Sequence, residues 1–474
     1  MKPMKFMLAA SLVCGTALFS GCSDDSSSTN PDDARFKSPK QAEFVRSTRA
    51  NLKDVAENLN FGSWKVANRL NTEFNEHVLT NPEFDKGIST LFSQQIQKSI
   101  KTVEKGGELA KSGYTHYATV DLSKLKYSFS VNKNRDGFDI EKADNFELVL
   151  PGVNPENNKK VDELFKVSIK QSGSNTKIVK KNRIPSDTAV VILVPEKISF
   201  SIDSKMSGSW ETLYSGNFKN EIKLAKGVEY GSLTNSTFNI KGEVKSTLAG
   251  NEKKGLPGDA TTLTVALGQN PSTHLANVEF GFVHNDKKIV ELSTELKNSD
   301  GMTDLSMLTS SNSIIDLFGA VMSGNSVEDQ KMTILEDLVI SLTVKDCDKM
   351  LALQHESASM RRNYASEADI KKYADKMNNL MELSLESKST NQKIAVKLGA
   401  VEFGVDYWTM PMLKFSDYDE YVSLLEVLDQ EAMEYGINIL DHAIDPMKES
   451  IVVARQLLQY FQTLMGIYLV EQAQ

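Results

Sequence analysis

The stretch VEFGFVHNDKKIVELSTEL, residues 278–296, carries the clearest sign of the fold. Apolar residues alternate with polar ones on both sides of His284–Lys287, first at Val278, Phe280 and Phe282 and then at Val290, Leu292 and Leu296. A period of two places successive side chains on opposite faces of a β-strand. Two such runs joined by a short polar segment predict an antiparallel β-hairpin.

The same alternation recurs upstream of this hairpin. It is found in the runs 125–131, 146–150, 165–169, 198–202, 238–244 and 263–267. One run differs, because Ala189–Val194 is continuously apolar, as is typical of a strand covered on both faces. We expect this strand to stop at Pro195. Many alternating strands with short turns predict a large antiparallel sheet.

Helical periodicity precedes the strands. Ser38, Pro39 and Gln41 have the residue types of an N-cap, a first helical position and the third position of a capping box. Apolar residues then recur from Phe44 to Leu59, mostly at spacings of three and four. Two further helices are predicted over 63–79 and 84–103.

The pattern after residue 312 is mixed. A short apolar helix is predicted around 314–321, and Ser366–Asp369 has the pattern of another helix start. Residues 332–344 are ambiguous, although their last residues favour a strand. Strands are expected around 394–401 and 410–415, and amphipathic helices over 417–434 and 445–465.

These patterns predict an α+β protein, with a large antiparallel β-sheet flanked by N-terminal and C-terminal helices. A barrel-like cup is the alternative way to close such a sheet. The expected regions are an N-terminal helical region (38–112), an antiparallel β region (113–311) and a mixed, mainly helical C-terminal region packed on the sheet (312–474).

The first 21 residues have the three parts of a secretory signal. Lys2 and Lys5 are positively charged, the apolar stretch 6–19 is too short to span a bilayer comfortably, and small residues lead into Cys22. We expect residues 1–21 to be removed. Residues 22–37 are expected to form a disordered tether, because the run 23–33 is polar and of low complexity.

The ending Leu18-Phe19-Ser20-Gly21-Cys22 resembles the lipobox of bacterial membrane lipoproteins, with Phe19 where the family usually has Leu. The resemblance implies that Cys22 carries fatty acyl chains such as palmitate and becomes the first mature residue. It also implies a lipid anchor in the bacterial outer membrane, at its periplasmic face or on the cell surface. The sequence Ser23-Asp24-Asp25 is similar to the export signal of surface lipoproteins in Bacteroidota.

The net charge of the chain limits the partners that it can bind, and its cysteine content limits the disulfides that it can form. The chain has a net charge of −9, which becomes about −11 when Lys2 and Lys5 leave with the signal. An acidic chain without a basic cluster disfavours nucleic acid and electrostatic docking to anionic lipid. Cys14 leaves with the signal and Cys22 is acylated, so Cys347 remains as the only free thiol and an intramolecular disulfide is excluded. A hydrophobic core must therefore supply the stability.

One segment has part of a calcium-binding pattern. Asn132–Gly137 resembles the start of an EF-hand loop, with oxygen-bearing residues at positions one, three and five and glycine at six. Position twelve is Ala143, where the loop needs a bidentate Glu. The neighbouring strands favour a hairpin turn with Asp136 and Gly137 at positive φ, and we expect no metal here.

Two other groups of residues have side chains that could carry chemistry. Cys347 and His355 would lie roughly 12 Å apart on one helix, and Asp346 and Asp348 would raise the pKa of the thiol, so a structural thiol is expected. Asp441, His442 and Asp445 lack a further metal ligand, and Asp445 before Pro446 is better explained as an N-cap.

The remaining candidates are single residues. His77, His116, His274 and His284 are scattered and expected to be solvated or structural. Trp64, Trp210 and Trp408 have the chemistry to stack on sugars, although core packing is favoured, and Trp210 has the most exposed-looking context. The run 250–255 has the glycine spacing of a P-loop, but Leu256 stands where the lysine must be.

The sequence contains no G-x-S-x-G, H-E-x-x-H, C-x-x-C or dinucleotide-binding pattern. It therefore predicts a non-enzymatic, membrane-anchored envelope lipoprotein that binds a ligand or an envelope protein, with no catalytic residue, metal or cofactor. A hydrophobic ligand fits a half-covered sheet. The alternatives are a glycan-active hydrolase with dispersed carboxylates and a structural or assembly lipoprotein.

Overall fold

A computed structural model describes residues 36–58, 70, 72–73, 75–79, 86–87, 90–91, 94, 97–124, 126–154, 159–180, 188–223, 237–248, 259–270, 272–297, 326–350, 352–353, 366–403, 406–427 and 435. The chain divides into two compact units. Unit 1 comprises residues 1–60, 273–300 and 318–445, and unit 2 comprises residues 61–272, 301–317 and 446–474.

Both units consist largely of antiparallel β-structure, and the fold is α+β, as the sequence predicts. In each unit the described strands form an open ladder. Within this part of the chain neither unit closes into the barrel-like cup that was the alternative. No helix among the described residues is long and apolar enough to cross a membrane.

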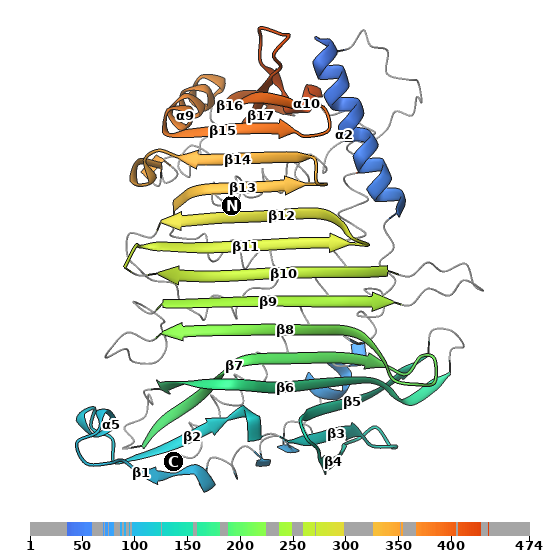
Figure 1. Cartoon of the computed structure of the whole chain (residues 1–474), viewed down its shortest axis with the longest axis vertical. Coiled ribbons are helices and arrows are strands. Elements are labelled where there is room, and N and C mark those ends of the chain that lie inside the picture. The colour runs from blue at the N-terminus through green and yellow to red at the C-terminus, as the bar shows by residue number, and fades with distance from the viewer. Residues whose placement is uncertain are drawn as a thin grey trace. The chain divides into compact units, whose positions relative to one another are not determined.

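Unit 1 is a β-meander in which each strand pairs antiparallel with the next (Figure 1). Its strands are β11 (Leu275–His284), β12 (Lys287–Lys297), β13 (Ser326–Ile334), β14 (Leu338–Val344), β15 (Met381–Ser387), β16 (Gln392–Phe403), β17 (Asp406–Lys414) and β18 (Val422–Ser423). The predicted 278–296 hairpin is confirmed as β11–β12. Its two turn residues, Asn285 and Asp286, have φ of 47° and 63°, which is the type I′ geometry that favours hairpins.

The ambiguous segment 332–344 forms the end of β13 and all of β14, so its strand character is confirmed. A tight turn at Leu335 and Glu336, both at positive φ, reverses the chain between the two strands. The described part of the region 312–474 contains strands β13–β18 together with helices α9 (Glu367–Leu380) and α10 (Leu424–Val427).

Helix α2 (Pro39–Asn58) confirms the first predicted helix. The Ser38 hydroxyl accepts a hydrogen bond from Gln41 N at 3.1 Å, and the Gln41 side chain accepts one from Lys37 N at 2.8 Å. Along its length α2 contacts successive turns of the meander (Figure 1). The contacts are Lys40 N to Asp417 at 2.9 Å, Ser47 to Ser389 at 2.6 Å, Asn51 to Asp337 at 3.1 Å, and the ion pair of Asp54 with Lys287.

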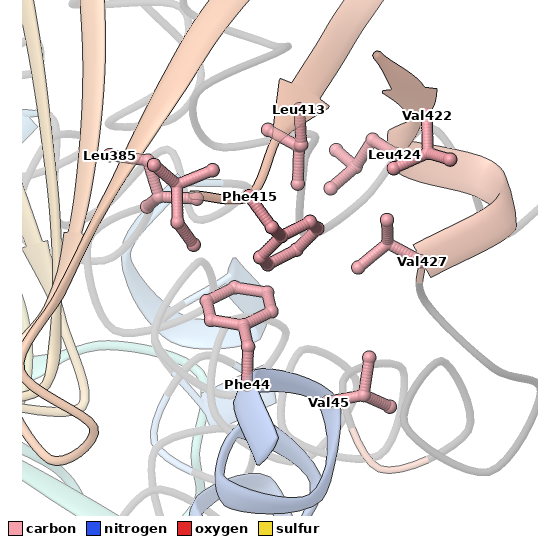
Figure 2. Close-up of a cluster of buried hydrophobic side chains, with 9 residues drawn as sticks. Phe44, Val45, Leu385, Leu413, Phe415, Val422, Leu424 and Val427 are labelled. Atoms are coloured by element: carbon pink, nitrogen blue, oxygen red, sulfur yellow. The ribbon is translucent and has the colours of Figure 1, made fainter. Parts of the chain in front are cut away.

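The core of unit 1 forms where α2 meets the last strands (Figure 2). Phe44 is 2% exposed and its ring lies 5.8 Å from that of Phe415, which follows β17. The other members are Val45, Leu385, Ile394, Leu413, Val422, Leu424 and Val427. The apolar stripe that predicted the helix is therefore the face that it buries.

The predicted helix over 417–434 starts later than expected. Residues 417–421 form a turn, β18 follows, and α10 begins at Leu424. Ser423 caps α10, because its hydroxyl accepts from Glu426 N at 3.2 Å. The rest of this segment, residues 314–321 and the predicted helix over 445–465 lie outside the described residues.

Unit 2 contains ten of the described strands. They are β1 (Lys101–Thr102), β2 (His116–Asp121), β3 (Tyr127–Val131), β4 (Phe138–Lys142), β5 (Phe146–Val153), β6 (Lys160–Lys180), β7 (Thr188–Ser204), β8 (Glu211–Lys223), β9 (Thr237–Leu248) and β10 (Asp259–Asn270). Two pairings, β2–β7 and β3–β5, are parallel, and the others are antiparallel.

The expectation that Pro195 ends its strand is wrong, since β7 continues to Ser204. Pro195 lies where β7 exchanges neighbours: residues 188–193 pair with β2, and 197–204 pair with β8. On the other edge it faces a bulge in β6, at Gly173 with φ of 85°. The proline N atom is therefore placed where the regular ladder is interrupted, and a missing donor is tolerated there.

The predicted helices over 63–79 and 84–103 are described only in part. Asn75–Leu79 is a π-helical turn, η2, and the described positions between 86 and 99 are helical. The second helix ends before its predicted boundary, because β1 begins at Lys101. Gly87 lies against β3 and β4, where a Cβ atom would sit 3.1 Å from Ile140 and 3.8 Å from Phe129.

Candidate functional site

One face of β5–β10 in unit 2 carries many apolar side chains. Cross-strand pairs share a face of a sheet, and one row of pairs runs Phe146–Ile169–Phe200–Gly216–Val244–Leu263. Adjacent rows add further aliphatic and aromatic side chains. We call the following set the apolar face: Phe146, Leu148, Val167, Ile169, Ile198, Phe200, Ile202, Phe218, Ile240, Val244, Leu263, Val265 and Leu267.

Two aromatic rings at the centre of the apolar face lie over glycines of the next strand. A Cβ atom at Gly216 would overlap the Phe200 ring, and one at Gly242 would overlap the Phe218 ring. The two rings are stacked, with centroids 6.2 Å apart and an interplanar angle of 21°. Glycine thus makes room for a flat aromatic layer.

Burial changes across the apolar face. Phe146, Leu148 and Val167 at one side are buried, whereas Phe200 and Phe218 are only partly buried. Other partly buried members are Ile169, Ile198, Ile202, Ile240, Val244 and Val265. The centre of the face therefore keeps apolar surface accessible.

The opposite face of the same strands is charged. Lys219 and Glu221 of β8 form an ion pair with side chains 49% and 52% exposed. Glu243 and Lys245 of β9 form another at 2.9 Å. One face is apolar and the other is charged, which explains why apolar and polar residues alternate in the sequence. The charged face is the one in contact with solvent.

Several residues singled out from the sequence lie outside the described part of the chain. They are Cys22, Trp64, the glycine-spaced segment 250–255, His355, and Asp441, His442 and Asp445. The lipidation of Cys22 stays a prediction, as do the signal at 1–21 and the tether at 22–37.

The Asn132–Gly137 segment forms the β3–β4 hairpin turn, as its flanking strands predict. The positive φ of 59° falls on Arg135, so the expectation that Asp136 and Gly137 take this conformation is wrong. The Asn132 side chain holds the turn by accepting from Asp136 N at 3.2 Å and donating to the Asp136 carboxylate at 2.8 Å. The side chains of Asn132 and Asp136 are thus hydrogen-bonded within the turn.

Cys347 is in no disulfide and has intermediate exposure, in a helical turn at 347–350. The Asp346 carboxylate caps this turn, accepting from Lys349 N at 3.0 Å and pairing with the Lys349 ammonium at 2.8 Å. These contacts with Lys349 hold the pKa of Asp346 below its usual range.

Trp210, the most exposed-looking tryptophan in the sequence, is half-buried under two cations. The ammonium groups of Lys166 and Lys205 lie 5.0 and 4.9 Å from its ring centroid. Its ring is therefore used in cation–π contacts. Trp408 lies in β17, paired with Val401, and is also half-buried.

Among the histidines, His284 is 4% exposed beside the β11–β12 turn, and His116 bonds to Thr115 at 2.8 Å. His274 is exposed, with φ of 56°. His77 does not stand singly as the sequence suggested, because the structure groups it with Glu73 and Glu76. Ligand atoms of these three residues lie within 4.8 Å of one another.

The grouping of His77 with two carboxylates has a local signal that sequence reasoning missed. Glu73, Glu76 and His77 follow a spacing of three and four, which places side chains on one side of a helix. Burial lowers the pKa of His77 and raises that of Glu73, so each group is biased towards its neutral form.

No protein-family model, curated protein or solved structure matches the chain.

Proposed function

We propose that this protein is a lipid-anchored lipoprotein of the bacterial outer membrane and that it binds a hydrophobic ligand on the apolar face of unit 2. The observation that carries the binding proposal is the stacked, partly exposed pair of Phe200 and Phe218 at the centre of this face. The anchoring proposal rests on the sequence Leu18–Cys22.

The binding proposal follows from the energetics of apolar surface. Covering apolar area releases about 25 cal/mol for each Å² removed from water. A ligand lying across the cross-strand row of Ile169, Phe200 and Val244 would contact side chains of three strands at once. These residues carry no charge, so the surface favours an apolar ligand such as an acyl chain over a polar one.

The anchoring proposal fits the position of Cys22. Its distance from Phe36, the first described residue, is 36 − 22 = 14 residues, and an extended chain of that length reaches about 50 Å. An acylated Cys22 would thus hold unit 1, which begins with α2, within this distance of the membrane. Two or more acyl chains suffice for stable attachment.

The anchor is tested by replacing the acylated residue. Cells expressing the full chain or its Cys22→Ser variant are fed an alkyne-bearing palmitate, and the protein is examined for the label. We expect label in the parent chain alone. Equal labelling of both chains, or of neither, would refute acylation at Cys22.

Ligand binding is tested with the full-length Cys22→Ser variant, which has no acyl chain of its own to occupy the apolar face. Native mass spectrometry and an organic extract are expected to reveal a co-purifying hydrophobic molecule, and a fluorescent fatty acid should bind saturably. Adding Phe218→Ser should weaken that binding, whereas Lys219→Ser, on the opposite face, should leave it unchanged. A clean mass with no saturable fatty-acid binding would overturn the proposal.

A further inference from the structure

The cluster of Glu73, Glu76 and His77 lies in unit 2 and shares no residue with the apolar face. Glu76 and His77 belong to the π-helical turn η2, and Glu73 precedes it. A π-turn has i→i+5 hydrogen bonds, which span one residue more than those of an α-helix, and such turns are common at functional sites. Here the turn gathers one imidazole and two carboxylates.

His77 is almost completely buried, at 2% exposure, and the Glu73 side chain is 15% exposed. His77 Nε2 faces Glu73 Oε2 at 3.4 Å. Within the described part of the chain, neither atom has a hydrogen-bond partner. A buried polar atom without a partner destabilises the fold, and a bound species between two such atoms that face each other would satisfy both of them.

The geometry fits a metal ion better than a proton. Two ligands at about 2.05 Å from a tetrahedral zinc ion are roughly 3.4 Å apart. This spacing is the one observed between His77 Nε2 and Glu73 Oε2. Glu76 is exposed and its oxygen lies within 4.8 Å of the other two ligand atoms, so a small side-chain movement would complete three protein ligands on the solvent side.

We propose that Glu73, Glu76 and His77 bind one divalent transition-metal ion of the zinc class. The imidazole nitrogen is the donor that selects zinc over calcium or magnesium, which prefer oxygen ligands alone. Water fills the remaining coordination, because Glu76 places the site at the surface.

Arg135 opposes the ion. Its positive charge acts on both Glu73 and His77: it opposes the rise that burial causes in the pKa of Glu73, and it adds to the fall that burial causes in the pKa of His77. A cation bound between these two residues is repelled by the same charge. Arg135→Asn removes the charge while keeping a residue that tolerates its φ of 59°, so this variant should bind the metal more tightly.

The experiment uses the full-length protein, purified in detergent without a histidine tag and stripped of metal with a chelator. Zinc binding is measured by calorimetry, and cobalt is used as a spectroscopic probe of the ligands. We expect one zinc ion per chain. Loss of an outer partner alone costs about 10–100-fold in metal affinity, so Glu73→Gln and His77→Gln, which remove ligands, should weaken zinc by roughly 100-fold or more. Arg135→Asn should strengthen it several-fold.

Two control variants separate this site from other metal-binding groups. Cys347→Ser removes the thiol of Cys347, and His274→Asn removes an exposed imidazole at positive φ. Both should retain parental zinc affinity, and the cobalt spectrum should lack a thiolate charge-transfer band. The proposal is overturned if the parent chain binds no zinc, or if circular dichroism shows both ligand variants folded and their zinc affinity is unchanged.

Discussion

At the scale of single residues, the Asn378 side chain supplies the backbone hydrogen bonds that a neighbouring strand would otherwise make. Its amide donates to Leu398 O at 2.9 Å and its oxygen accepts from Leu398 N at 2.8 Å. Val396 is the last residue of β16 that pairs with β15, so Leu398 lies just beyond the ladder, where α9 takes over. Both backbone groups of Leu398 bond to Asn378 of α9. The cross-strand partner of Leu398 is Pro411, which has no N–H, and Leu398 does not need a hydrogen bond from it.

Removing this amide should be costly. Asn378→Ala leaves two backbone groups of Leu398 without partners, and we expect a loss of about 1–3 kcal/mol in the free energy of unfolding of unit 1. Asn379→Ala is the matched control, since Asn379 is the exposed neighbour on the same helix, and its effect should stay within about 0.5 kcal/mol. Urea unfolding followed by circular dichroism measures both variants. Equal midpoints for the two would contradict the assigned role.

Gly216 is required because another side chain lies too close for a Cβ atom, and not because of its backbone conformation, which is not at positive φ. The Phe200 ring occupies the space of a Cβ atom. Gly216→Ala therefore forces the ring away from Phe218, and we expect a loss of about 1–3 kcal/mol, as in other overpacked sites. Near-ultraviolet circular dichroism should report the disturbed aromatic pair. Asn217→Ala, on the exposed charged face, should change neither quantity.

At the scale of elements, the start of α9 is a complete capping box. The Ser366 hydroxyl accepts from Asp369 N at 3.3 Å, and the Asp369 carboxylate accepts from Ser366 N at 3.1 Å and from its hydroxyl at 2.7 Å. The bond from the Ser366 side chain is the main cause that holds the pKa of Asp369 below its usual range.

The capping box predicts a pH dependence. A carboxyl group whose pKa is lower in the folded state stabilises the fold above its unfolded pKa of about 3.9, and this contribution disappears as pH falls through the folded pKa. Ser366→Ala should destabilise α9 by about 1 kcal/mol at pH 7. The difference from the parent should shrink as acidification protonates the Asp369 carboxylate, so it should be smaller at pH 3 than at pH 7. Urea unfolding at the two pH values checks this, and a difference that grows on acidification would contradict it.

Local patterns explain which elements were predictable. Ser366–Asp369 and Ser38–Gln41 each combine a capping residue with an apolar stripe, and both gave helices at the expected starts. Pro195 was misread because its tolerance depends on β2 and β8, which exchange places beside it. The segment after Asp417 was misread because its helical spacing overlaps a turn and a short strand that pairs with β17. In both segments, pairing with strands distant in the sequence determined the structure.

At the scale of the whole molecule, the candidate sites depend on register. The row that contains Phe200 joins residues from 146 to 263, and no local pattern reveals which of these residues become neighbours. Unit 1 likewise combines α2 with strands that begin at Leu275. By contrast, Glu73, Glu76 and His77 are close in sequence, and a search for helical spacing among metal-binding residues would have found them.

The overall charge leads to the last prediction, which rests on the proposed anchor. With a net charge of about −11 after loss of Lys2 and Lys5, the mature chain is repelled by anionic lipid, so acyl chains must hold it at the membrane. Charged contacts weaken in about 1 M salt, where the Debye length falls to roughly 3 Å, whereas apolar burial does not. Salt washing should therefore leave the parent chain in the membrane fraction and detergent should release it. The chain without residues 1–22, which lacks both the signal and the acylated cysteine, should be soluble in both treatments. Release of the parent by salt alone would show that a peripheral charge contact, and no lipid anchor, holds the protein at the membrane.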